Sequence, residues 1–243
     1  MATKKDDLII ISPLETVETE ITIVGDTPLV MHAWNVKAKR EMLEKQMGLT
    51  KTKARETKNP IDDFISSAYW LTPMPESLDE DSIEKAFENA RFGFPCSSFK
   101  LATLATASRL KWNVPKTVMN TAFWILPNST TYYTGDLEYD ENKKSLVTHF
   151  NVEKSQDMVE IFSDRPVMRE DMVRVGGISK TSDIRYRAEF RNWSAKVTLS
   201  YVRNGAISIE QILNALNAAG KVTGIGEMRP EKGLNCGAFH IVA

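Results

Sequence analysis

Alternating apolar and polar residues predict the strands of this chain. Residues 18–24 alternate with a period of two, and residues 195–201 do the same with alanine, valine, leucine and tyrosine at every second position. This alternation is typical of a strand that has one face in a core and the other toward solvent. An apolar run at 120–126, closed by Pro127, predicts a third strand, and 238–242 predicts a short last one.

Two segments carry the signature of helices. Residues 99–110 are rich in alanine and leucine and follow two serines, which are good helix caps. Residues 209–219 place isoleucine, leucine and alanine on one helical stripe. Ser208 and Gln211 have the spacing of a capping box at the start of that stripe. We therefore expect a helix after the first strand and a second helix after the strand at 195–201.

The order of these elements is strand, helix, strand, strand, helix, strand. That order is the ferredoxin-like plan, which RNA-recognition motifs share, and it places the chain in the α+β class. Its antiparallel sheet has helices on one face and leaves the other face free for a ligand. We expect a single domain over residues 1–243, with core elements at about 15–29, 94–128 and 193–243.

Two large insertions complete the predicted architecture. The first, 30–93, begins with a basic arm and continues with an acidic segment. The second, 129–192, begins with a hairpin at about 130–150 and continues as a polar, irregular, basic loop over 151–192. These insertions hold most of the residues that do not follow the core pattern.

Overall charge argues against a generic polyanion binder, because 31 lysines and arginines face 32 acidic residues and the net charge is −1. The basic residues are nevertheless segregated. Residues 37–58 hold eight lysines and arginines against three acids, and residues 169–203 hold eight against four. Any nucleic-acid surface must therefore come from segregation of charge and not from the total charge.

Aromatic residues interleave with the arginines of the second cluster, at Tyr186, Phe190 and Trp193. Arginine pairs with phosphate, and an aromatic face that stacks on an unpaired base contributes about 1–3 kcal/mol. This pattern predicts a single-strand contact. The alternative is a solvated loop that Phe190 and Trp193 anchor to the core, and the sequence does not separate the two.

Residues that would support catalysis or metal binding do not cluster in the sequence. The two cysteines, Cys96 and Cys236, and the three histidines show no metal-ligand spacing, and no acid stands out as catalytic. We predict no catalytic residue, no metal and no cofactor. The first residues do not form a signal peptide or a membrane span, so we expect a cytoplasmic protein without a membrane partner.

A glycine-rich segment precedes the last strand, with Gly224, Gly226, Gly233 and Gly237. Glycine permits positive φ and close approach of backbone, and successive amides can form an anion-binding nest. Arg229 could add a bidentate phosphate contact. The alternative is a connector whose glycines only make turns. The segment is not a dinucleotide fingerprint, because it follows a helix and opens a strand.

Two segments resemble the RAMP superfamily, the repeat-associated proteins of CRISPR effector complexes. Residues 94–100, with the sequence FPCSSFK, are similar to the I-P-x-S-S-x-K-x-A segment of that family. The pattern Gly224-x-Gly226-x-x-Arg229, continued to a glycine and Phe239, is similar to its C-terminal glycine-rich loop. The chain also resembles uncharacterised proteins encoded by bacteriophages.

The resemblance implies an RNA-recognition-like core with a basic insertion, whose copies polymerise into a helix along a single-stranded nucleic acid. The chain departs from the family at two points. Cys96 stands where glycine is usual, and Thr103 follows Ala102 where arginine is usual. The insertion at 30–93 does not align with a family thumb, and no residue supports the RNA cleavage of some members.

The sequence thus predicts a non-catalytic protein that binds single-stranded RNA or DNA and self-assembles along it as a homo-oligomer or helical filament. The alternative is a structural or interaction protein that mimics a CRISPR backbone subunit, as an assembly subunit or inhibitor, without nucleic-acid affinity. The candidate nucleic-acid contacts are Lys37, Lys39, Arg40, Lys100, Arg109, Lys111, Arg185, Tyr186, Arg187, Arg191, Trp193, Gly224, Gly226 and Arg229.

Overall fold

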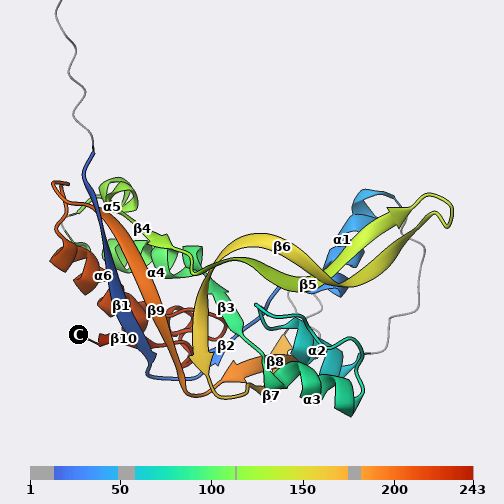
Figure 1. Cartoon of the computed structure of the whole chain (residues 1–243). Coiled ribbons are helices and arrows are strands. Elements are labelled where there is room, and N and C mark those ends of the chain that lie inside the picture. Colours follow the sequence, from blue (N-terminus) through green and yellow to red (C-terminus); the bar gives the residue numbers. More distant parts are fainter. Residues whose placement is uncertain (1–13, 49–57, 113, 175–181, 243) are drawn as a thin grey trace, which may run out of the picture.

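The computed structural model describes residues 14–48, 58–112, 114–174 and 182–242. It is a mixed α+β protein built on antiparallel sheets (Figure 1). The basic residues between 49 and 57, and the glycines and Lys180 within 175–181, lie outside the described residues.

The larger sheet contains the strands that the alternation predicted. Its strands are β1 (Thr16–Gly25), β3 (Phe92–Pro95), β4 (Phe123–Leu126), β5 (Ser129–Asp140), β6 (Ser145–Ser163), β9 (Trp193–Val202) and β10 (Phe239–Val242). Four of them lie in the order β10-β1-β9-β4, and every neighbouring pair is antiparallel. The end of β6 pairs with the start of β9, on the same side of β9 as β4.

Helices α4 (Cys96–Arg109) and α6 (Ile209–Val222) pack against each other and against the larger sheet. The alternation of β1 and β9 explains this packing, because Ile21 lies opposite Val197 and Ile23 opposite Ala195, and all four are buried. The predicted capping box of α6 is present. Both predicted helices are therefore confirmed.

The opposite face of β1 and β9 carries polar side chains. Glu18 and Glu20 are exposed on β1, and the Lys196 ammonium lies 3.9 Å from the Glu20 carboxylate. Trp124 on β4 is 41% exposed and lies opposite Ser200 in the register. Two carboxylates on the central strand make this face unfavourable for a phosphate chain.

Strands β5 and β6 form a long hairpin that extends from the larger sheet, and α1 (Val36–Gln46) packs beside it (Figure 1). The hairpin was predicted, but its arms are longer than residues 130–150. Arg40 of α1 donates from Nη1 to the Leu146 carbonyl at 3.1 Å. The predicted strand at 120–126 is shorter than expected, because α5 (Lys116–Ala122) occupies its first residues.

A second sheet lies below the hairpin in Figure 1, with α2 (Pro60–Ser66) and α3 (Glu80–Glu88) nearby. Its order is β2-β8-β7, comprising β2 (Leu29–Val30), β8 (Ser182–Phe190) and β7 (Val167–Arg174). The prediction of an irregular loop over 151–192 is therefore wrong. Charged residues occupy both strands, with Arg169 opposite Arg187 and Asp171 opposite Arg185, so the apolar alternation that identifies a strand is weak.

One core joins elements of both sheets. Trp70, Phe92 and Phe190 lie in it, with ring centroids 4.8 Å apart for Trp70 and Phe92 and 5.1 Å for Phe92 and Phe190. Trp193 is also part of it and is only 3% exposed. Phe190 and Trp193 therefore anchor their segment to the core, as the alternative supposed, although they belong to strands β8 and β9 and not to a solvated loop.

Candidate functional site

A shallow pocket of about 160 Å³ lies where several elements meet. Its walls come from the segment just after β2, the segment between α2 and β3, β3 itself, the first turn of α4, and the loop between α6 and β10. The lining residues are His32, Tyr69, Phe94, Ser98, Gly226, Glu227 and Arg229.

The pocket brings together the two segments that resemble the RAMP superfamily. Phe94 and Ser98 belong to the first segment, and Gly226 and Arg229 belong to the second. More than a hundred residues separate the two segments in the sequence, and the packing of α4 against α6 brings them to one place.

The glycines of the loop are required by its own backbone packing. Gly226 has φ +78°, and a Cβ there would lie 2.6 Å from the Val30 carbonyl oxygen. Gly237 has φ +69°, and a Cβ there would lie 1.8 Å from the Ile225 carbonyl oxygen. Gly224 also has a positive φ, of +67°. These approaches explain why only glycine fits.

The backbone amides of the loop are used internally. Ile225 donates to Gly237 at 2.9 Å, Glu227 to Val30 at 2.9 Å, and Gly237 to Pro28 at 2.8 Å. Gly224 donates to the Ala219 carbonyl at 2.8 Å. Because these four amides already have acceptors, they are not available to form the predicted anion nest.

Glu227 supplies a carboxylate to the pocket. Its Oε1 lies 3.7 Å from His32 Nδ1, and its side chain is 45% exposed. Contact with His32 lowers its pKa to about 2, and the charges of Arg187 and Arg229 act in the same direction, although burial opposes them. Glu227 is therefore ionised at neutral pH.

Arg229 lies at the pocket and is held by its neighbours. It donates from Nε to Glu231 at 2.8 Å and from Nη1 to the Gly226 carbonyl at 3.1 Å. Arg109 pairs with the same Glu231 and also donates to Thr223 at 3.1 Å. Arg109 thus ties the end of α4 to the loop, whereas Nη2 of Arg229 has no hydrogen-bond partner within the described ranges.

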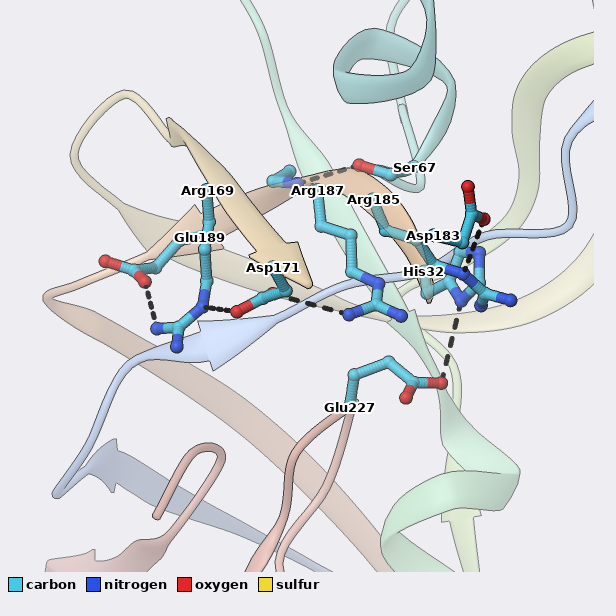
Figure 2. A network of polar contacts seen from close by, with 10 residues as sticks. His32, Ser67, Arg169, Asp171, Asp183, Arg185, Arg187, Glu189 and Glu227 are labelled. Carbon is cyan, nitrogen blue, oxygen red and sulfur yellow. Dashed lines mark hydrogen bonds and ion pairs between the residues drawn. The ribbon is translucent and has the colours of Figure 1, made fainter. Parts of the chain in front are cut away.

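A chain of alternating charges runs along β7 and β8 toward the pocket (Figure 2). Arg169 donates to Glu189 at 2.7 Å and to Asp171 at 2.9 Å. Arg187 donates to the other oxygen of Asp171 at 3.4 Å. In Figure 2 the Arg187 guanidinium lies between Asp171 and the His32–Glu227 pair.

Burial rules out two of the predicted nucleic-acid contacts. Arg187 is only 4% exposed, so it cannot reach a phosphate in solution. Trp193 is buried and donates from Nε1 to the Thr27 carbonyl at 2.8 Å, so neither face of its ring is open to a base. Both side chains were misassigned because a buried arginine and a buried tryptophan have the same sequence signature as an exposed binding pair.

The other predicted residues of β8 and its following turn remain at the surface but have acidic neighbours. Arg191 donates to Glu189 at 2.9 Å, and Arg185 lies 3.9 Å from Asp183. Tyr186 is half-buried opposite Glu170. The excess of basic residues predicted for this segment is therefore largely neutralised locally.

The remaining predicted lysines and arginines lie outside the pocket lining. Lys100 places its ammonium 5.6 Å from the ring centres of Phe123 and Trp124, and burial lowers its pKa. Lys111 is exposed just after α4. On α1, Lys37, Lys39 and Arg40 are half-buried, and Arg40 is engaged with the hairpin.

Sequence reasoning missed His32, Tyr69 and Glu227. Burial alternates after β2, since Met31 and Ala33 are buried whereas His32 and Trp34 are exposed, Trp34 by 55%. This alternation over four residues was present in the sequence as apolar, polar, apolar, aromatic.

No protein-family model and no curated protein sequence matches the chain. Within the described residues, no group of three or more histidine, cysteine, aspartate or glutamate side chains could hold a metal ion. In the same part of the chain, no helix is long and apolar enough to cross a membrane.

Proposed function

We propose that this protein is a non-catalytic, RAMP-like protein that binds single-stranded RNA or DNA at the pocket and self-assembles along the strand. The observation that carries the proposal is the meeting of Phe94 and Ser98 with Gly226 and Arg229 in one pocket. Two motifs that are far apart in the sequence meet at one surface. This favours a common role in binding one ligand over the alternative that each motif only shapes a local turn.

The proposal includes a ferredoxin-like core made of β1, α4, β4, β9, α6 and β10. The strand order β10-β1-β9-β4 with antiparallel neighbours supports it, because that plan places the first and third strands at the centre. In this core the ligand does not cross the face of the sheet that the helices leave open, because Glu18 and Glu20 lie there. It instead crosses the end of the molecule at the start of α4.

The side chains of the pocket suit an unpaired strand. Arg229 offers a guanidinium, Ser98 and Tyr69 offer hydroxyls, and the half-buried Tyr69 offers an aromatic ring that the buried Phe94 supports edge to face. Trp34, two residues after His32, adds an exposed ring close in sequence to the pocket. Stacking of a base on such rings requires that the base be unpaired.

The hairpin supports assembly. It extends from the larger sheet and carries exposed apolar side chains, with Phe150 63% and Tyr139 37% exposed. Exposed aromatic residues on an arm that projects from the core favour contact with a second copy.

The test is binding of labelled single-stranded RNA, single-stranded DNA and blunt duplex across a salt series, with particle size followed by light scattering. We expect single strands to bind more tightly than duplex, with affinity falling as salt rises, and particle size to grow with strand length. Equal or tighter binding of duplex would contradict the proposal.

A second candidate function is favoured by the neutralised charges of β7 and β8. If Arg169, Arg187 and Arg191 serve only their acidic partners, the protein is a structural or interaction protein that mimics a CRISPR backbone subunit. It would then bind no labelled strand at any salt concentration, yet still associate with copies of itself or with another assembly.

A further inference from the structure

The pocket also indicates which part of a strand it takes, an inference that rests on the proposed function. Its volume of about 160 Å³ is smaller than the roughly 300–1,000 Å³ of pockets that enclose a whole small molecule. The pocket therefore suits one group of a larger ligand. A phosphate is disfavoured beside Glu227, because two anions repel each other.

The walls of the pocket favour a flat ring. Tyr69 and Phe94 meet edge to face with ring centroids 5.8 Å apart, and Tyr69 also meets Tyr132 at 5.6 Å. Burial raises the pKa of Tyr69, and Glu227 adds to this effect, so its hydroxyl stays protonated and can donate. An aromatic wall beside hydrogen-bonding groups is the arrangement that holds an unpaired base.

Glu227 determines which base fits. An ionised carboxylate only accepts hydrogen bonds, through two adjacent oxygens. On its Watson–Crick edge, guanine presents two adjacent donors, N1–H and the exocyclic amino group. Adenine and cytosine each present one donor beside an acceptor, and uracil presents one donor between two acceptors. We propose that the pocket selects a guanine base of the single strand, with Glu227 accepting from both donors.

Arg187 acts as a positioning residue for this carboxylate. It is 4% exposed, its Nε has no hydrogen-bond partner among the described residues, and its charge lies close enough to lower the pKa of Glu227. Figure 2 shows its guanidinium on the side of Glu227 that faces Asp171. Arg229, with Nη2 unused, then remains for the phosphate next to the bound base.

The test measures fluorescence anisotropy with labelled short oligouridylates that differ in one central nucleotide. We expect guanosine to bind about fivefold or more tightly than adenosine, the size of one good bidentate contact. Inosine, which lacks the exocyclic amino group, should fall between them. The Glu227→Gln variant should lose the guanosine preference, because an amide offers one acceptor and one donor.

Glu20→Gln is the matched control, since Glu20 is an exposed carboxylate on the open face of β1. It should leave the guanosine preference intact. A preference that persists in Glu227→Gln, or equal binding of guanosine, inosine and adenosine by the parent, would overturn the inference while leaving single-strand binding in place. If Glu227→Gln fails to fold, the inosine comparison on the parent decides alone. Failure to bind every oligonucleotide would overturn the proposed function together with this inference.

Discussion

The pocket and the β7–β8 strands contain similar side chains but use their charges differently. On the strands, Arg169 and Asp171 each contact more than one opposite charge, so the arginines hold the structure together. At the pocket, one nitrogen of Arg229 has no hydrogen-bond partner among the residues that the structure describes, and Glu227 lies 3.7 Å from His32. Partner count and burial identify Arg169 and Arg187 as structural residues, which the density of arginines in the sequence does not.

The two regions are linked through Arg187. It belongs to β8, yet its charge acts on Glu227 of the loop. The strands therefore serve the pocket indirectly, by setting the charge and place of one carboxylate. If this is right, substitutions on the strands should mainly change the free energy of unfolding, and substitutions of exposed residues at the pocket should mainly change affinity.

The largest expected effect concerns the loop backbone. Gly237→Ala should lower the free energy of unfolding by more than about 3 kcal/mol, because the new Cβ would lie 1.8 Å from the Ile225 carbonyl at a positive φ. Gly233→Ala is the matched control, with a similar φ of +75° and no atom within 4 Å, and should cost only about 1–2 kcal/mol. Urea denaturation measures both, and equal losses would mean that the loop is not closely packed.

The next effect concerns the buried network. Arg187→Met should destabilise the fold by about 3 kcal/mol, because Asp171 and Glu227 lose a buried cation. Arg185→Met removes a side chain that is 37% exposed with a 3.9 Å ion pair, and should cost less than about 1 kcal/mol. Thermal or urea unfolding distinguishes them; a neutral Arg187→Met would show that the network does not stabilise the strands.

A smaller effect concerns affinity alone. Trp34→Ala should weaken single-strand binding by about 1–3 kcal/mol without a comparable loss of stability, since the ring is 55% exposed. Trp124→Ala, on the open face of the larger sheet and 41% exposed, is the control and should bind like the parent. If instead Trp124 carries the affinity, the strand crosses the open face and the pocket is not the site.

The smallest effect is a pH dependence of stability. The folded-state pKa of Glu227 is about 2, below its ordinary value of 4.5, so its ionised form stabilises the fold above pH 4.5. That contribution is lost as the pH falls from 4.5 toward 2, and solvent reduces it because the side chain is 45% exposed. The melting temperatures of the parent and Glu227→Gln should therefore converge as the pH falls through this range. If the two melting temperatures keep a constant difference between pH 4.5 and 2, ionised Glu227 does not stabilise the fold through its contact with His32.

Much of the larger sheet followed from sequence, because β1 and β9 each bury one face and thus alternate visibly. The helices followed from the stripe and cap at Ser208 and from the alanine- and leucine-rich run of α4. The predicted serine cap of α4 is wrong, because Ser97 and Ser98 lie inside the helix and Pro95 is its N-cap. The second sheet did not follow, because charges on β7 and β8 pair across the strands, as Arg187 does with Asp171, and such pairs are invisible without the register.

The site was predicted only in part for a related reason. Gly226 and Arg229 are fixed positions of a recognisable motif, whereas Glu227 is one of its variable positions and His32 and Tyr69 reach the pocket through long-range packing. Whether Arg187 and Trp193 were exposed depended on the tertiary structure, so composition alone gave them the wrong role.

The most direct test compares the two regions in one binding experiment. Arg229→Ala and the double variant Arg185→Ala with Arg191→Ala are titrated with the same labelled single strand across a salt series. We expect Arg229→Ala to weaken binding and flatten the logarithmic salt dependence by about 0.7, the value of one phosphate contact, and the double variant to behave like the parent. Normal binding by Arg229→Ala together with weakened binding by the double variant would contradict the assignment of the site to the pocket.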